Sequence, residues 1–248
     1  MNKKVLGIIG GGQLGMFICI AARKIGVKTV IYSNEEHFSA KKFCDHYFVG
    51  NTGDEIKINK FIDSADFFTI ETENIPKEFL RKIENQKKLF PSSKIIEIAQ
   101  NRLKEKKFLN NINGIETTPY FEINNFEELK TYSKEFEYNC ILKTQELGYD
   151  GKGQYVIKNS NLEKFKNLNL TNLILEKRIN FQLEISVIVI GNLIKKIHYP
   201  PVENHHKDSI LRQTIFPANI SEKISKKAIK MALKISRSLK LEGVLAVE

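Results

Sequence analysis

The first hundred residues alternate short apolar runs with segments that repeat apolar positions at helical spacing. Short strands separated by helices predict a mostly parallel, doubly wound α/β sheet. In the first helical segment we expect Leu14, Ile18, Ala21, Ala22 and Ile25 to face that sheet. The strand-like runs lie at 5–9, 29–32, 47–49 and 67–70, and the helical ones at 14–25, 56–62, 78–83, 95–99 and 102–109.

From residue 120 the pattern changes to that of an α+β module. It predicts a strand at 120, a helix at 126–133, a hairpin of 140–142 with 155–157, and an edge strand at 173–176. Antiparallel strands at 184–190 and 193–199 follow, and then a helix with Ser221 as N-cap and Gly243 just past its end. The chain stops inside a strand-like segment at 243–248, so we expect this last sheet to lack strands and the chain to be cut short.

Composition narrows the class of protein. The chain has 248 residues, of which 42% are hydrophobic and 27% charged, which is enough to bury a core. It contains no signal-like or membrane-length apolar run, so we expect no membrane partner. Cys19, Cys44 and Cys140 lie far apart among apolar neighbours, which predicts reduced thiols in the cytoplasm.

The formal net charge of +10 does not by itself indicate nucleic acid. The lysines are scattered among glutamates, and no basic stripe with interleaved aromatic residues occurs. We therefore expect no nucleic-acid partner, and at most a general attraction for anionic substrates.

The strongest chemical signal is Lys143 at the end of an apolar run, followed by the glycine-rich segment 148–154. Glycines allow backbone N–H groups to approach an anion closely, and Lys143 and Lys152 offer charges to phosphate oxygens. A strand on each side predicts a phosphate-binding hairpin loop, unlike the strand-to-helix P-loop. The alternative is a plain glycine-rich hairpin tip.

The segment Gly10 to Gly15 fits GxGxxG between a strand and a helix, which is the setting of a dinucleotide site. The acidic residue expected at the end of the second strand is missing, since Glu35 comes late. On physical grounds this glycine segment predicts only an anion site at a helix N-terminus, and such a site would suit a ribose phosphate equally well. Glu71 and Glu73 follow a neighbouring strand, at the edge where open α/β sheets bind ligands.

Two more groups of polar residues stand out in the second half. Glu176 and Glu184 bracket a passage between two strands, where a backbone edge and a carboxylate can bind adenine and ribose. Residues 203–206, which end in His205 and His206, follow two prolines and are predicted to form a rigid loop. The adjacent histidines do not predict a zinc site; we expect His206 to be a polar hydrogen-bonding residue of a site.

Taken in order, these segments resemble the N5-carboxyaminoimidazole ribonucleotide synthetase (PurK) family of the ATP-grasp superfamily over the whole chain. The resemblance rests on eight motifs in family order. They are GGGQLG at 10–15, ETENIP at 71–76, QNR at 100–102, Lys143, GYDGKGQ at 148–154, FQLEIS at 181–186, ENHH at 203–206 and GVLAVE at 243–248.

The resemblance implies three regions: a preATP-grasp α/β domain at 1–100, a small lid domain at 101–179 and an incomplete large domain at 180–248. It also implies a homodimer and a reaction of purine biosynthesis. ATP converts bicarbonate to carboxyphosphate, and the amine of aminoimidazole ribonucleotide then takes the carboxyl group. The products are the carbamate, ADP and phosphate.

The resemblance also assigns residues. Gln13, Leu14 and Glu73 match positions near the ribonucleotide, as do Tyr149 and Asp150, which are the catalytic candidates. Glu248 matches the first carboxylate for Mg²⁺ (or Mn²⁺); the second has no counterpart, so we expect little ligase activity. Met16, Thr72 and Ser209 depart from the family pattern. The positions that match the ATP site are Arg102, Lys143, Gly148, Tyr149, Asp150, Gly151, Lys152, Gly153, Gln154, Glu176, Lys177, Ile179, Glu184 and His206.

Two other functions stay open at this point. The formate-dependent glycinamide ribonucleotide transformylase, of the same superfamily, shares the GKGQ ending of the loop. The pair Tyr149 and Asp150 favours the carboxylating enzyme, because the transformylase typically has small hydroxyl residues there. An NAD-dependent oxidoreductase is the alternative of a different class, and it depends on GxGxxG alone.

Overall fold

The protein forms two compact units. The computed structural model describes residues 4–148 and 153–248. Unit 1 comprises Met1–Glu97 with Leu241–Val244, and unit 2 comprises Ile98–Lys240 with Leu245–Glu248. The finer division into three regions, with boundaries after residues 100 and 179, stays a prediction.

Unit 1 is built on a five-stranded parallel sheet in the order β3-β2-β1-β4-β5, which confirms the predicted sheet. The order reverses direction between β1 and β4, so the carboxyl ends of these two strands form a ligand-binding edge. Its elements are β1 (Val5–Ile9), α1 (Gln13–Lys24), β2 (Lys28–Ser33), η1 (Ser39–Lys42), β3 (His46–Val49), α2 (Glu55–Asp63), β4 (Phe67–Ile70), α3 (Lys77–Glu84), β5 (Lys88–Phe90) and most of α4 (Ser93–Ala99).

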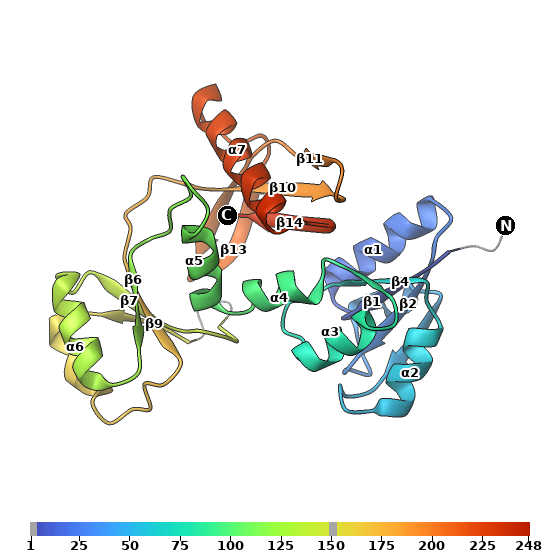
Figure 1. Ribbon diagram of the computed structural model, residues 1–248, viewed down its shortest axis with the longest axis horizontal. Coiled ribbons are helices and arrows are strands. Elements are labelled where there is room, and N and C mark those ends of the chain that lie inside the picture. The colour runs from blue at the N-terminus through green and yellow to red at the C-terminus, as the bar shows by residue number, and fades with distance from the viewer. Residues whose placement is uncertain (1–3, 149–152) are drawn as a thin grey trace. The chain divides into compact units, whose positions relative to one another are not determined.

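Alternating side chains of the strands divide the core of unit 1 into two layers. Ile8 of β1 packs with Cys19 of α1, whereas the next residue, Ile9, belongs to the cluster formed with α2 and α3. Right-handed crossovers place α1 on one face of the sheet and α2 and α3 on the other (Figure 1). The period-2 pattern along β1 therefore explains both helical layers.

The buried face of α1 matches the predicted one only in part: Ala22 is buried and Ile18 packs against the core as predicted, but Leu14 and Ile25 do not. Gly15, Cys19 and Ala22 are buried, whereas Leu14 and Ile25 are 62% and 78% exposed. A β-carbon on Gly15 would lie 3.1 Å from the carbonyl oxygen of Gly10, so the helix approaches its own loop closely. Small side chains allow this approach, and the larger apolar residues are left outside.

Unit 2 contains a four-stranded antiparallel sheet in the order β6-β9-β7-β8. The predicted edge strand at 173–176 is wrong, because β9 lies between β6 and β7 and its first four residues are all buried. Burial on both faces explains its uninterrupted apolar run. The elements are α5 (Arg102–Asn110), β6 (Tyr120–Ile123), α6 (Phe126–Glu135), β7 (Cys140–Thr144), β8 (Gln154–Ile157), η2 (Asn159–Phe165) and β9 (Leu173–Lys177).

A second sheet of unit 2 has the order β11-β10-β12-β13, and β14 also pairs with β10. Residues 203–206 belong to β12, so the predicted loop is wrong; β12 pairs with a strand on each side. The hairpin turn lies at 192–195 rather than at 191–192. The elements are β10 (Glu184–Gly191), β11 (Lys196–His198), β12 (Val202–Lys207), β13 (Ile210–Ile215), α7 (Glu222–Ser238) and β14 (Gly243–Val247).

Of the two caps predicted for α7, the N-terminal one is confirmed and the C-terminal one is wrong. The Ser221 side chain accepts a hydrogen bond from the Ile224 N–H, as expected of an N-cap. At the other end Lys240 takes the left-handed conformation, with φ of 51°, and Gly243 instead begins β14. None of the described helices is long and apolar enough to cross a membrane.

Candidate functional site

The glycine-rich loop joins two antiparallel strands, as predicted. β7 pairs with β8, and Lys143 lies opposite Gln154. Gly148, Gly153 and Gln154 are described, whereas the predicted residues Tyr149, Asp150, Gly151 and Lys152 lie outside the described residues. The described part of the loop is therefore its stem.

Arg102 of α5 holds this stem through the backbone. Its guanidinium donates hydrogen bonds to the carbonyl oxygens of Thr144 (2.9 Å) and Gly148 (2.7 Å). Gly153 has a φ of 69°, and a β-carbon there would lie 2.7 Å from Thr144 Oγ1. Glycine is thus required for both the conformation and the close approach. Arg102 was predicted to lie in an ATP site, and the structure places its charged group on the loop itself.

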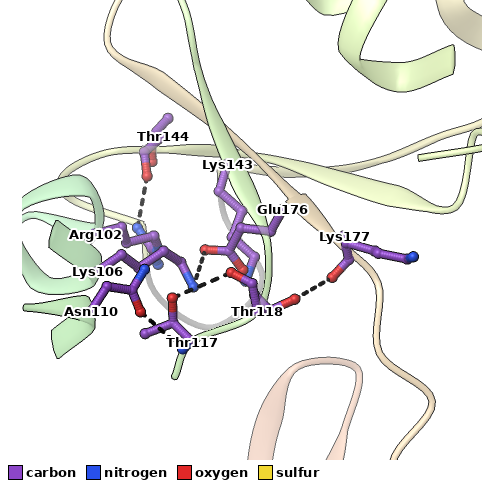
Figure 2. Close-up of polar contacts among 9 residues, drawn as sticks. All are labelled: Arg102, Lys106, Asn110, Thr117, Thr118, Lys143, Thr144, Glu176 and Lys177. Carbon is purple, nitrogen blue, oxygen red and sulfur yellow. Dashed lines mark hydrogen bonds and ion pairs between the residues drawn. The ribbon is translucent and has the colours of Figure 1, made fainter. Parts of the chain in front are cut away.

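Lys143 and Glu176 form a partly buried ion pair beside this stem. Lys143 Nζ lies 2.8 Å from Glu176 Oε2, and the two side chains are 20% and 10% exposed. Lys106 Nζ lies 3.4 Å from the other carboxylate oxygen. Figure 2 shows the side chains of Lys106, Lys143 and Glu176 close together. These three side chains together hold two positive charges and one negative charge.

Lys143 and Glu176 line a cavity of about 520 Å³ in unit 2. This volume is in the range of small-molecule sites. The wall continues from Lys177, the last residue of β9, into the following segment, which has no regular secondary structure and contains Ile179; both were predicted site residues. The described residues that line it are Thr118, Ile141, Lys143, Glu176, Lys177, Arg178, Ile179, Asn180 and Phe181.

The same segment offers both apolar surface and a backbone donor. Ile179 and Phe181 are 51% and 65% exposed, so each leaves apolar surface for a ligand. Among the described residues, the Ile179 N–H has no hydrogen-bond partner. A planar heterocycle with a ring nitrogen matches such a combination of apolar faces and a free amide.

Glu184 and His206 come together on the second sheet, outside the lining of that cavity. His206 Nδ1 lies 3.1 Å from Glu184 Oε1 but outside hydrogen-bond geometry. This buried oxygen consequently has no hydrogen-bond partner in the described part of the chain. The Glu184 side chain as a whole is 30% exposed, so the rest of its carboxylate can accept a bond from a ligand hydroxyl. On the opposite face of β12, His205 Nε2 lies 2.8 Å from Glu203 Oε1.

In unit 1 the glycine segment after β1 packs against the carboxylate of Glu71. A β-carbon on Gly12 would lie 2.3 Å from Glu71 Oε1, and one on Gly10 would lie 2.6 Å from Oε2. The carboxylate therefore lies close to the N-terminus of α1, where the helix dipole favours negative charge. A dinucleotide pyrophosphate in the same place would be repelled, which counts against an NAD site.

The predicted ribonucleotide residues Gln13, Leu14 and Glu73 are exposed at this edge of unit 1. Gln13 and Leu14 begin α1, and Glu73 follows β4, so all three lie near the carboxyl ends of β1 and β4. A cavity of about 650 Å³ borders the glycine segment from the side of β2 and η1. Glu35 and Glu71 are both on its wall, so it does not favour a phosphate either.

Glu248, the predicted metal ligand, is exposed directly after β14. Over residues 4–148 and 153–248, no group of three or more His, Cys, Asp or Glu side chains is placed to hold a metal ion. Burial raises the pKa of Glu105, a carboxyl group of α5, and the negative charges of Glu176 and Glu248 act in the same direction. Glu248 alone therefore does not make a metal centre.

Sequence reasoning missed Lys106 and Phe181. Lys106 follows Arg102 by four residues, so the two lie on one face of α5, and this spacing is a signal that could have found it. Phe181 was noted only as part of a motif. Neither the carboxylate that Lys106 contacts nor the cavity beside Phe181 is visible without the fold.

Comparison with known proteins adds to this geometry. The family model "Ribonucleotide synthetase preATP-grasp domain" matches residues 2–100, and the model "ATP-grasp domain" matches residues 108–248. The N5-carboxyaminoimidazole ribonucleotide synthase of Bacillus subtilis is 36% identical over 247 residues, which are 98% of this chain and 65% of that protein. The chain thus spans slightly less than two thirds of the length of this relative.

Solved structures agree with the sequence relatives. The ADP complex of an N5-carboxyaminoimidazole ribonucleotide synthetase has a TM-score of 0.92 and 34% identity, over 100% of this chain and 67% of that one. The Aspergillus clavatus synthase with ADP and 5-aminoimidazole ribonucleotide has a TM-score of 0.88 and 26% identity, over 99% and 65% of the two chains. The fold is therefore the predicted ATP-grasp fold with a preATP-grasp parallel sheet, and the chain belongs to the N5-carboxyaminoimidazole ribonucleotide synthase family.

Proposed function

We propose that this chain is an ATP-dependent carbon–nitrogen ligase that carboxylates 5-aminoimidazole ribonucleotide with bicarbonate in purine biosynthesis. The observation that carries the proposal is the cavity of unit 2, in which Lys143 and Glu176 lie beside the irregular segment after β9. The relatives named above support the reaction, and the solved relatives support ADP and aminoimidazole ribonucleotide as ligands. The three regions predicted from the sequence are part of this proposal.

The cavity fits an adenine nucleotide in size and chemistry. Ile179 and Phe181 offer apolar surface to the adenine ring, and the Ile179 N–H offers a hydrogen bond to a ring nitrogen. Lys143 supplies a positive charge for phosphate oxygens, and we assign the partly exposed carboxylate of Glu184, which lies outside the cavity lining, to a ribose hydroxyl. In this proposal Gly148, Gly153 and Gln154 contact the phosphates, and the same role for Tyr149, Asp150, Gly151 and Lys152 stays a prediction, because these four lie outside the described residues.

The chemistry that ATP supplies is activation of bicarbonate, a poor electrophile, as carboxyphosphate before the substrate amine takes the carboxyl group. Phosphoryl transfer depends mainly on positioning and charge neutralisation. Lys143 and the backbone of the loop stem serve those two roles, and Arg102 fixes the stem through Thr144 and Gly148. No nucleophilic side chain is needed for this reaction.

The metal requirement is a separate part of the proposal. One exposed carboxylate, Glu248, does not fit a complete site for Mg²⁺, which takes about six oxygen ligands. We propose that Mg²⁺, or Mn²⁺, enters with the nucleotide phosphates and that Glu248 supplies one oxygen ligand.

For the second substrate we propose that the ribonucleotide binds at the edge formed by Gln13, Leu14 and Glu73. The predicted role of Tyr149 and Asp150 at the ribonucleotide stays a prediction, because both lie outside the described residues. The exposed apolar side chains of Phe17 on α1 and Ile25 at its end, which are 59% and 78% exposed, support the proposed homodimer. The absence of disulfides among the described cysteines supports a cytoplasmic location.

Nucleotide titration tests the proposal without requiring turnover. We expect ADP and ATP to bind the 248-residue protein in calorimetry, and Lys143→Met to weaken ADP binding by at least about tenfold. Lys130→Met, which removes an exposed lysine of α6, is the matched control and should leave the affinity unchanged. Binding of NADH without binding of ATP would overturn the proposal, as would equal ADP affinity in the Lys143 and Lys130 variants.

A further inference from the structure

The carboxylate of Glu176 has two ammonium partners, one on each oxygen. Lys143 Nζ lies 2.8 Å from Oε2, and Lys106 Nζ lies 3.4 Å from Oε1 (Figure 2). The Glu176 and Lys106 side chains are only 10% and 11% exposed. A carboxylate at this depth requires a positive partner, because removing one partner of a buried pair leaves an uncompensated charge.

The two lysines differ in their access to the cavity. Lys143 lines it, whereas Lys106 is not among the lining residues. Lys106 Nζ instead lies 5.7 Å from the centre of the Tyr120 ring, a second favourable position for an ammonium group. Glu176 is thus held from the cavity side by Lys143 and from the protein side by Lys106.

A nucleotide in the cavity competes with Glu176 for Lys143. Phosphate oxygens attract the ammonium group of Lys143 as the Glu176 carboxylate does, and a group that turns toward phosphate gives up part of its contact with the carboxylate. Without a second partner, this exchange would leave a buried negative charge beside a negatively charged ligand. The exchange would then oppose binding.

We infer that Lys106 is a positioning residue that keeps Glu176 neutralised and in place while Lys143 turns to the nucleotide. The inference depends on the proposed nucleotide site, and it assigns Lys106 a role that involves no contact with the ligand. Glu176 then remains fixed at the end of β9, where the segment that lines the cavity begins.

A double-mutant cycle on ADP affinity tests the inference. Lys106→Met removes the charge but leaves the pair of Lys143 and Glu176, so the free protein stays folded. We expect ADP affinity to fall by at least about tenfold in Lys106→Met. In the Glu176→Gln background no carboxylate needs neutralising, so the same change at Lys106 should alter the affinity by less than about twofold.

Two further variants separate positioning from a structural role. Lys106→Arg should recover most of the affinity, because it restores a cation behind Glu176, whereas the neutral Lys106→Gln should behave as Lys106→Met does. Thermal unfolding of each variant identifies a folding defect, and Lys106→Gln replaces Lys106→Met in the cycle if the latter fails to fold.

The outcomes separate this inference from the proposed function. An equal loss of affinity in both backgrounds, or no loss in Lys106→Met, would overturn the role of Lys106 while leaving the nucleotide site intact. A wild-type protein that binds no ADP would instead refute the proposed function itself.

Discussion

Arg102 connects α5 to the stem of the glycine-rich loop, and its removal tests how that loop is held. The guanidinium donates to the carbonyl oxygens of Thr144 and Gly148, whereas the Arg102 main-chain N–H donates separately to the carbonyl oxygen of Gln145. Arg102→Leu therefore removes two hydrogen bonds and leaves the third. The change weakens the stem without uncoupling α5 from it.

The expected magnitude follows from the charged donor. A hydrogen bond to a charged group contributes about 1.5–3 kcal/mol. Both bonds are only partly buried, so the released carbonyl groups regain water, and the lower value applies to each. Together they stabilise the stem by about 3 kcal/mol, which corresponds to about a hundredfold change in the equilibrium for local opening.

Amide hydrogen exchange measures this opening directly. The Thr144 N–H donates to the Gly153 carbonyl oxygen across the stem at 2.9 Å, so it exchanges when the stem opens. In Arg102→Leu it should exchange about a hundredfold faster. Arg81→Leu, which breaks a pair with Glu97 in unit 1, should leave its exchange unchanged.

Nucleotide affinity then separates two roles for Arg102. If Arg102 acts by holding the stem, ADP affinity and Thr144 protection should fall together in Arg102→Leu. Reduced affinity with unchanged exchange at Thr144 would refute the reasoning, because it would show that the guanidinium acts on the nucleotide directly.

Three further predictions concern stability and reactivity. Gly7→Ala should destabilise unit 1 by about 1–3 kcal/mol in denaturant unfolding, because the added β-carbon would lie 2.2 Å from the fully buried ring of Phe68; no recovery in Gly7→Ala/Phe68→Leu would contradict this cause. Burial raises the pKa of the Cys44 thiol from 9.0 to about 11, so the folded state favours the neutral thiol. The stabilisation that this thiol contributes is fully present below pH 9.0 and is lost as the pH rises through about 11. Alkylation of Cys44 at about pH 8 should accordingly be slow until the protein is unfolded. Burial also raises the pKa of Glu105 above 4.5, so the ionised carboxylate destabilises the folded state above that pH. Glu105→Gln should therefore raise the melting temperature at about pH 7 but not at about pH 4. The same increase in melting temperature at both pH values would contradict this cause.

The sequence predicted which helices and strands form better than it predicted where each strand lies within its sheet. The parallel sheet of unit 1 and the hairpin around the glycine-rich loop follow from periodicity and glycine content, and both are present. The position of β9 in the centre of its sheet does not follow, because an apolar run of five residues suits an edge or a centre until its partners are known. The same limit applies to β12, whose polar residues resemble a loop until β10 and β13 are seen to pair with it.

Small residues explain the errors in unit 1. A helical face chosen by hydrophobicity favours Leu14 and Ile25 beside Ala22, but the close approach at Gly15 buries Cys19 with Ala22 and leaves the two larger residues exposed. Likewise, GxGxxG predicts an anion at the start of α1, and the protein itself supplies that anion as the carboxylate of Glu71. A sequence motif indicates which kind of group a site attracts, whereas only the fold shows which group occupies that site.

Strand register connects the hydrophobic core to the ion pair of the candidate site. Leu142 and Leu175 are register partners in β7 and β9, and they are 1% and 0% exposed. Their burial on one face directs Lys143 and Glu176, the next residue of each strand, to the opposite face, where both line the cavity. A slip of one residue would turn Glu176 into the core and away from Lys143. The apolar pair that looks purely structural therefore determines whether the charged pair can form.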